Sequence, residues 1–111
     1  MKPNFFTLPD LSGGNLVSFP CNGSSMSPVI NHGDIVVCRE TKVTEIKDGE
    51  IYAVRNNGSV WVKYVRTIKD ADGEIQKLKL SSADYLEHDP FIEVINDFTR
   101  VYKVIRRISH F

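Results

Sequence analysis

Three short turn signals between segments of alternating apolar and polar residues constrain this chain of 111 residues more than any other feature. The strongest is Asn56-Asn57-Gly58, because Asn-Gly readily supplies the positive φ angles that the tight turn of a β-hairpin requires. Asp48-Gly49 and Asp72-Gly73 are the other two. The segments that they delimit are residues 50–55, 59–69 and 74–81. We predict that these segments form a three-stranded antiparallel meander.

The rest of the chain also favours strands. We expect short strands at residues 15–19 and 34–38, and another after Pro90, where a polar loop ends. The C-terminal segment is ambiguous, because its apolar residues fit a helical stripe. They are largely β-branched, however, and we therefore predict a strand there. The sequence predicts a mostly-β fold.

Composition limits the kind of protein further. Lys plus Arg (14) balances Asp plus Glu (14), which argues against DNA binding by this segment alone. Cys21 and Cys38 are too few for a disulfide scaffold and lack metal-ligand spacing, so we expect reduced thiols, no metal and no cofactor. No stretch approaches the ~18 apolar residues of a membrane helix, and none resembles a signal peptide. We expect a cytoplasmic protein with no membrane partner.

The segment CNGSSMSPVINHGD (residues 21–34) is a small polar loop rich in serine and glycine, placed directly before an apolar strand. Loops of this kind either connect strands or hold a reactive hydroxyl. A serine hydroxyl needs a base to become a nucleophile. His32, His88 and His110 are the histidines of the chain, and none has an obvious carboxylate to orient it.

Lys63 is a more specific candidate for the base. Alternation along residues 59–69 places Val60, Val62 and Tyr64 on one face and Trp61, Lys63 and Val65 on the other. Apolar neighbours on its own face would lower the pKa of the Lys63 ammonium, and a neutral amine can accept the proton of a serine. The alternative is that Lys63 extends past Trp61 into solvent.

The order of these motifs resembles the LexA and phage-repressor family of self-cleaving peptidases. The similarity extends from about Phe19 to Ile108. The matching elements are Gly23-Ser24-Ser25-Met26-Ser27-Pro28, then Asn31-His32-Gly33-Asp34-Ile35-Val36, then Gly49-Glu50-Ile51-Tyr52-Ala53-Val54, and Val62-Lys63. The resemblance implies a small, twisted, partly barrel-like fold of antiparallel strands, like that of LexA and signal peptidase.

By the same resemblance Ser25 is the nucleophile and Lys63 the general base. Backbone N–H groups around Ser25 and Met26 would form the oxyanion hole, and the Met26 side chain would line the cleft. Ser24 and Ser27 are assigned to hydrogen bonding within the loop.

The resemblance also predicts the organisation of the chain. We expect an N-terminal arm at residues 1–20 and a peptidase and dimerisation domain at residues 21–111. The chain would be the C-terminal part of a homodimeric regulator that binds DNA through an N-terminal helix-turn-helix outside this sequence. Self-cleavage would relieve repression, with a RecA-type filament and the SOS response as the associated trigger.

The sequence departs from the family at the cleavage site. Self-cleaving members cut an Ala-Gly or Cys-Gly bond upstream of the serine, yet no alanine precedes Ala53 and Cys21 is followed by Asn22. Two alternatives therefore stay open: a catalytically silent dimerisation module, and a UmuD-like polymerase accessory protein. Signal peptidase shares these motifs, but the lack of a membrane anchor argues against it. The basic residues Arg100, Lys103, Arg106 and Arg107 are expected to be solvated charges on an edge strand.

Overall fold

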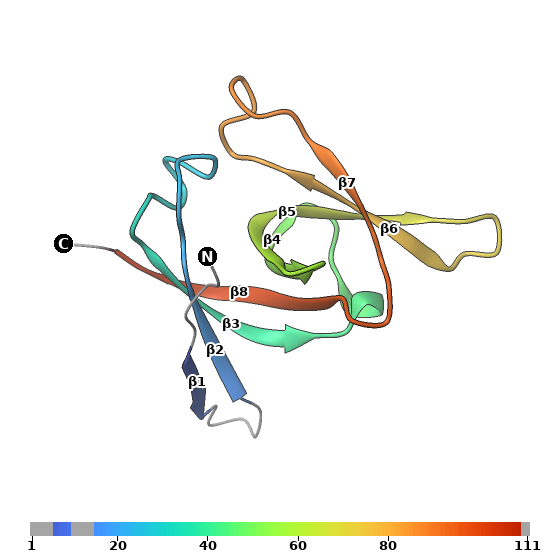
Figure 1. The fold of residues 1–111 in the computed structure, drawn as a ribbon, viewed down its shortest axis with the longest axis horizontal. Helices are drawn as coiled ribbons and strands as arrows, with labels where there is room; N and C mark the ends of the chain where they lie inside the picture. The colour runs from blue at the N-terminus through green and yellow to red at the C-terminus, as the bar shows by residue number, and fades with distance from the viewer. Residues whose placement is uncertain (1–5, 10–14, 110–111) are drawn as a thin grey trace.

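The computed structural model describes residues 6–9 and 15–109, which form one antiparallel sheet of eight strands (Figure 1). The strands are β1 (Phe6–Pro9), β2 (Asn15–Pro20), β3 (Ile35–Thr41), β4 (Glu50–Asn56), β5 (Ser59–Lys69), β6 (Ile75–Ser81), β7 (Phe91–Val94) and β8 (Arg100–Ile108), with one 3-10 turn, η1 (Val43–Glu45). Their order across the sheet is β1-β2-β3-β8-β4-β5-β6-β7. The predicted mostly-β antiparallel class is confirmed, and the sheet curls without closing into a barrel, because its edge strands β1 and β7 do not pair with each other.

The predicted meander is strands β4, β5 and β6. At the first turn Asn57 and Gly58 have φ angles of 51° and 81°, and the ladder closes on the pair Asn56 and Ser59. Both angles lie in the left-handed region, as the two-residue turn requires. At the second turn the Asp70 carboxylate accepts the backbone N–H groups of Asp72 and Glu74, both at 2.9 Å.

The C-terminal segment forms strand β8, as predicted. It lies between β3 and β4 and pairs with both, so it is the element that joins the two halves of the sheet. The expectation that its basic residues lie on an edge strand is therefore wrong, although the predicted exposure to solvent is confirmed for Arg100, Arg106 and Arg107. Two basic residues also form ion pairs, Lys103 with Glu50 at 3.1 Å and Arg107 with Asp34 at 3.3 Å.

The curl of the sheet buries both faces of the central hairpin β4–β5. Figure 1 shows this hairpin between β2, β3 and β8 on one side and β6 and β7 on the other. The first apolar core contains Phe19, Cys21, Met26, Ile30, Val36, Cys38, Ala53 and Tyr102. The second contains Tyr52, Val54, Val65, Leu78, Leu80 and Val101. Neighbouring residues of β4 therefore alternate between two cores, as a strand buried on both faces must.

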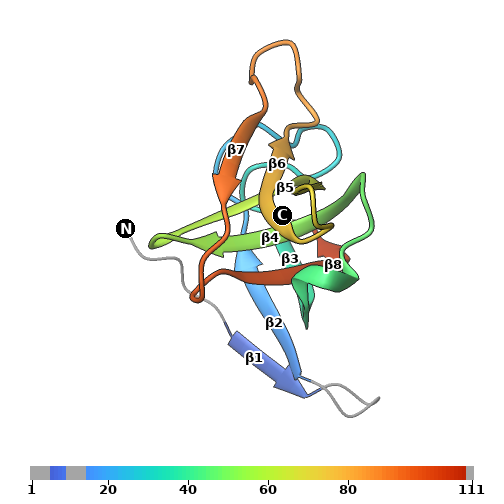
Figure 2. The same cartoon turned by 90° about the vertical axis from the view of Figure 1, so that its right-hand side faces the viewer.

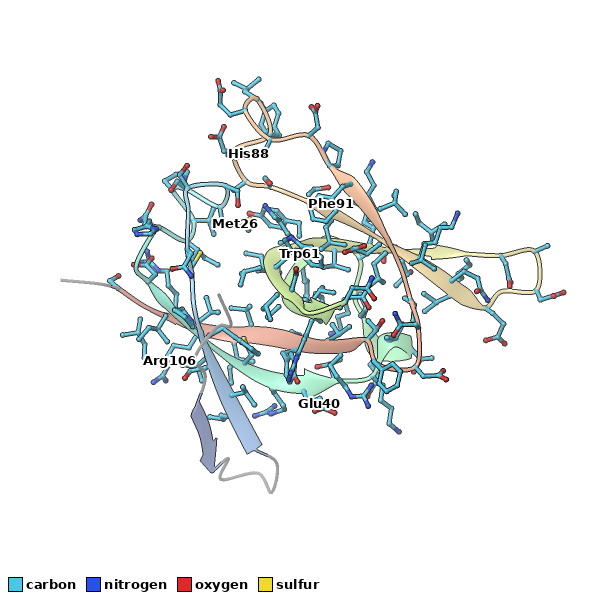
Figure 3. The ribbon with its side chains drawn as sticks, in the orientation of Figure 1. Met26, Glu40, Trp61, His88, Phe91 and Arg106 are labelled. Atoms are coloured by element: carbon cyan, nitrogen blue, oxygen red, sulfur yellow. The ribbon has the colours of Figure 1, made fainter. Side chains whose placement is uncertain are left out.

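The predicted faces of β5 are confirmed by these cores. Val60, Val62 and Tyr64 pack against the first core, and Trp61 packs against the second. The Trp61 ring meets the Phe91 ring edge-on with centroids 5.5 Å apart (Figure 3). This contact ties the short edge strand β7 to β5 and fixes the apolar neighbour of Lys63 on its own face.

Residues expected to form an arm contribute to the sheet. Strand β1 pairs with β2, and β2 pairs with β3. The division of the chain at residue 20 stays a prediction. In the described ranges no helix has the length and apolar character of a membrane span.

Candidate active site

The loop between β2 and β3 is closed at its base by backbone hydrogen bonds. The Cys21 N–H donates to the Asp34 carbonyl at 2.8 Å, and the Gly33 N–H donates to the Cys21 carbonyl at 2.9 Å. One turn further out, the Gly23 N–H donates to Nδ1 of His32 at 2.8 Å. These bonds hold the two arms of the loop together and leave Ser25 at its tip.

The side chain of Asp34 also holds the base of the β2–β3 loop in place. Its side chain is buried, and Oδ2 accepts the Asn31 N–H at 2.8 Å and a guanidinium N–H of Arg107 at 3.3 Å. The loop is thereby attached to β8 as well as to the ends of its own strands.

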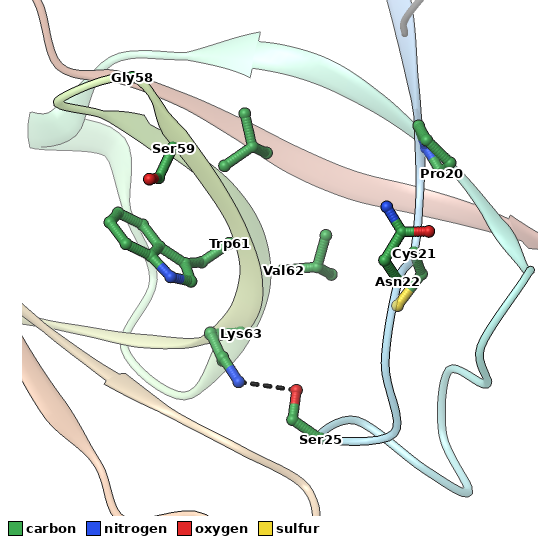
Figure 4. A pocket seen from close by; sticks show the side chains of 10 residues that line it. Pro20, Cys21, Asn22, Ser25, Gly58, Ser59, Trp61, Val62 and Lys63 are labelled. Atoms are coloured by element: carbon green, nitrogen blue, oxygen red, sulfur yellow. Dashed lines mark hydrogen bonds between the residues drawn. The ribbon is translucent and has the colours of Figure 1, made fainter. Parts of the chain in front are cut away.

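Ser25 and Lys63 meet at the tip of the loop. Lys63 Nζ lies 2.7 Å from Ser25 Oγ and donates to it (Figure 4). The second partner of the amine is Ser82 Oγ, at 2.8 Å. Three distant parts of the chain therefore converge on one amine: the β2–β3 loop, strand β5 and the residue after β6.

The surroundings of Lys63 favour its neutral form. Its side chain is only 8% exposed, and burial lowers the pKa of the ammonium below its usual value of 10.5. A thiolate at Cys21 would act in the opposite direction, but burial raises the pKa of that thiol. No carboxylate in the described part of the chain forms an ion pair with Lys63. The two hydroxyls accept hydrogen bonds from the amine, but being uncharged they favour its ammonium form less than a carboxylate would.

Ser82 was not singled out from the sequence. In the β5–β6 ladder Tyr64 pairs with Ser81, so Lys63 and Ser82 occupy the next opposed positions. The hairpin signal at Asp72-Gly73 was present in the sequence, and counting the register outward from it could have found Ser82. The register shift between Ile68 and Lys69 displaces that count by one residue.

The pair opens into a pocket of about 390 Å³. Its lining residues are Pro20, Cys21, Asn22, Ser25, Gly58, Ser59, Val60, Trp61, Val62 and Lys63. One wall is the first half of β5, residues 59–63, which pairs with β4 on one side. On its other side β6 pairs only from Tyr64 onward, so among the described residues this stretch of backbone has no strand beside it. An extended segment of protein can add to such an edge.

The backbone around the serine offers donors to this pocket. The N–H groups of Ser25 and Met26 have no acceptor among the described residues. The Ser25 carbonyl, by contrast, accepts the Asp84 N–H at 2.9 Å, which fixes the peptide plane after the serine.

The Met26 side chain lies in the interior. It is fully buried in the first core, its Sδ accepts the Ala83 N–H at 3.3 Å, and it is not among the residues that line the pocket (Figure 3). It anchors the β6–β7 connection to the serine loop from below.

Neither histidine in the described part of the chain, His32 or His88, forms a hydrogen bond with Ser25. His32 serves the base of the loop through Nδ1, and His88 lies in the β6–β7 connection, where its N–H donates to the Asp84 carbonyl. His110 lies outside the described residues. No group of three or more His, Cys, Asp or Glu side chains is arranged as a metal site within the described ranges.

The fold and the site together define a mostly-β domain with a serine–lysine pair at the mouth of a pocket. The chain belongs to the Peptidase S24-like family, whose model matches residues 6–90. It is also 31% identical over 96 residues to a protein of Haemophilus influenzae named as an uncharacterized HTH-type transcriptional regulator. That match covers 86% of this chain and 37% of the relative, so the chain spans well under half of the relative's length. The family-level resemblance drawn from the sequence is confirmed.

Proposed function

We propose that this chain is the peptidase and dimerisation domain of a helix-turn-helix transcription regulator, and that it hydrolyses one peptide bond of the regulator itself. Ser25 is the nucleophile and Lys63 the general base. The observation that carries the proposal is the 2.7 Å contact between Lys63 Nζ and Ser25 Oγ, made by a buried amine that has no carboxylate partner in the described part of the chain.

The chemistry follows from the positions of these groups. The neutral amine of Lys63 takes the proton of Ser25 as Oγ attacks the carbonyl carbon of the scissile bond. The N–H groups of Ser25 and Met26 stabilise the charge that develops on the carbonyl oxygen. The Lys63 ammonium then gives its proton to the leaving amine, which leaves an ester on Ser25. Lys63 next deprotonates a water molecule, whose attack on the ester releases the acid and restores the hydroxyl.

The substrate is an extended segment of polypeptide. It lies along residues 59–63 of β5 as an added strand, with its scissile carbonyl over Ser25. The unpaired edge and the pocket that runs beside it support this placement. Ser82 holds the amine of Lys63 toward the serine through their 2.8 Å hydrogen bond.

The regulatory setting is proposed from the relative and the family. The Haemophilus influenzae protein is named as an HTH-type transcriptional regulator. We infer that a helix-turn-helix domain outside this sequence binds DNA, that the domain dimerises, and that cleavage separates the two parts in the cytoplasm. Two-fold symmetry of the dimer would match a palindromic operator. A RecA-type filament is the trigger that the resemblance implies.

A silent dimerisation module is the second candidate, because residues 1–24 contain no Ala-Gly or Cys-Gly pair. The two candidates differ in one measurement. The domain is incubated with peptides that carry a central Ala-Gly bond, and products are identified by mass spectrometry. Cleavage that disappears in both Ser25→Ala and Lys63→Ala supports the peptidase, whereas intact peptides at alkaline pH support the silent module.

A further inference from the structure

Trp61 is the only tryptophan of the chain, and it lines the catalytic pocket. Its ring meets the Phe91 ring edge-on, with centroids 5.5 Å apart, and both side chains pack against the second core without being fully buried. The proposed reaction gives this aromatic pair no role. Partly exposed aromatic rings in a pocket are typical contacts for an apolar group of a ligand.

The backbone beside Trp61 is open on one edge. Residues 59–63 of β5 pair with β4, whereas β6 joins the opposite edge of β5 only from Tyr64 onward, where it pairs through Ser81. Figure 2 shows β6 and β7 running across the direction of β4 and β8. Among the described residues no strand lies along the open edge at residues 59–63, which is the edge that the substrate occupies in the proposed reaction.

A substrate strand on this edge can extend in only one direction. The hairpin closes on the pair Asn56 and Ser59, so the alternation of an antiparallel ladder directs the backbone groups of Val60 and Val62 to the open edge. An added strand can bond to these groups between Lys63 and Ser59, but β6 occupies the edge beyond Lys63. The substrate on one side of the scissile bond therefore lies along β5, and the other side has to leave the sheet.

The side chains of such a strand alternate between two walls. Figure 4 shows Trp61 and Lys63 on one side of β5, and Val62 and Asn22 on the other. A substrate residue opposite Trp61 has its side chain on the Trp61 face, with the two Cβ atoms about 5 Å apart. Because Lys63 holds its amine at Ser25 and Trp61 lies two residues along the strand, this substrate residue is about two or three residues from the scissile bond.

We propose that Trp61 and Phe91 form an apolar subsite of the catalytic pocket. It binds a side chain of the size of leucine or larger, about two or three residues from the scissile bond, on the side of the bond that lies along β5. Burial of this side chain against the two rings provides the affinity. The inference rests on the proposed peptidase function and adds a requirement for substrate sequence that the serine–lysine pair does not impose.

The test uses synthetic peptides with a central Ala-Gly bond and one Leu, placed in turn one to six residues away on either side. Matched peptides carry Asn, which has a similar shape, at the same position. Binding to the Ser25→Ala variant is measured by anisotropy of a labelled peptide, which separates recognition from cleavage. We expect Leu two or three residues from the bond, on one side only, to tighten binding about tenfold over Asn.

The fluorescence of Trp61 gives a second measurement on the same samples. Since the chain has no other tryptophan, a shift of the emission to shorter wavelength reports on the environment of this ring alone. We expect the shift with the Leu peptides that bind more tightly, and none with their Asn partners. A Leu preference without any change in Trp61 emission would contradict the proposed contact.

Variants of the subsite locate the effect. Added to Ser25→Ala, Trp61→Thr and Phe91→Thr should each remove most of the preference for Leu, and Trp61→Phe should reduce it. Phe98→Thr is the matched control, because it makes the same change at an aromatic residue that is 83% exposed and does not line the catalytic pocket. Thermal unfolding of each variant checks that the fold is retained, and Trp61→Phe serves where Trp61→Thr fails to fold.

The possible results separate this inference from the proposed function. Equal binding of Leu and Asn peptides at every position overturns it, as does an absence of binding, an equal preference on both sides of the bond, or a preference that survives the Trp61 and Phe91 variants. Cleavage by the native chain without a Leu preference supports the serine–lysine pair and rejects the subsite. A Leu preference in binding without cleavage supports the subsite and counts against hydrolysis.

Discussion

Asp34 and Lys63 are both buried ionisable residues of the serine site, yet the protein treats them in opposite ways. Asp34 is 3% exposed and has a charged partner, Arg107, together with the backbone N–H of Asn31. Lys63 is 8% exposed and has two hydroxyls, with no ion pair in the described ranges. The carboxylate therefore has a counter-charge in the interior, whereas burial lowers the pKa of the amine.

The difference separates a structural role from a chemical one. A buried charge with an oppositely charged partner holds the base of a loop in one position. If either partner is removed, the remaining charge is buried with nothing to compensate for its lost hydration, which is unfavourable. A buried amine without a counter-charge weakens the fold, and such groups persist mainly where their chemistry is used. The predictions below test this contrast from the largest expected effect to the smallest.

Replacing the amine with an apolar side chain of similar length should eliminate hydrolysis. We expect Lys63→Met to lower kcat/KM for peptide cleavage by about a thousandfold or more, because no other base contacts Ser25 among the residues that the structure describes. Lys79→Met is the matched control, since Lys79 is exposed on β6. Near-native cleavage by Lys63→Met in a peptide assay would show that another group accepts the proton.

Neutralising Asp34 should act on stability. Asp34→Asn keeps the shape of the side chain but removes the charge that faces Arg107, and we expect the free energy of unfolding to fall by about 2 kcal/mol. Arg107→Gln should cost less, because that side chain is 41% exposed and solvent screens the pair. Urea denaturation measures both. An unchanged urea midpoint for Asp34→Asn would show that the charge of Asp34 does not stabilise the fold.

Cleavage should rise with pH. Only the neutral amine accepts a proton, so kcat/KM increases about tenfold per pH unit until it levels off below the ordinary lysine pKa of 10.5. Between the lowered pKa of the folded protein and 10.5 the unfolded chain binds more protons, and stability therefore also increases with pH across this window. Initial rates over a pH series measure the first effect. A flat profile would indicate a different base.

Ser82 should act as a positioning residue. Its hydroxyl accepts a hydrogen bond from the ammonium form of Lys63, and such a bond favours the charged state. We expect Ser82→Ala to lower kcat about tenfold and to move the inflection of the pH profile to lower pH. Ser81→Ala is the control. A fall in stability with an unmoved inflection would mean that Ser82 only packs.

The smallest effect concerns the stability of the Lys63 variant. Because the buried amine has no counter-charge in the described ranges, Lys63→Met should raise the free energy of unfolding by about 1 kcal/mol at neutral pH. Lys63→Met would then raise the free energy of unfolding, whereas Asp34→Asn lowers it. A Lys63→Met protein less stable than the native chain would show that its two hydroxyl contacts outweigh the cost of burial.

Local signals in the sequence were sufficient for the meander and for the candidate pair. Turn residues such as Asn57 and Gly58 act through their own φ angles, so the hairpins needed no tertiary information. Ser25 and Lys63 were found through alternation on β5 and the order of the family motifs. Their distance apart depends on the curl of the sheet, which brings the β2–β3 loop over β5.

Other features depend on pairings between distant segments. The internal position of β8 requires that a strand from the end of the chain enter between β3 and β4, which no local pattern specifies. The contact of Ser82 with Lys63 depends on the register of β5 with β6, and this register shifts between Ile68 and Lys69. The burial of the Met26 side chain depends on which side of the β2–β3 loop packs against the first core.

The position of β8 has a consequence for synthesis of the protein. Among the described residues the backbone ladders connect β3 with β4 only through this strand, so without it the segment that carries Ser25 and the segment that carries Lys63 share no continuous sheet. A nascent chain emerges from the ribosome with its N-terminal part first. Residues 100–108 must therefore leave the exit tunnel before the loop that carries Ser25 and the strand that carries Lys63 can be joined in one sheet.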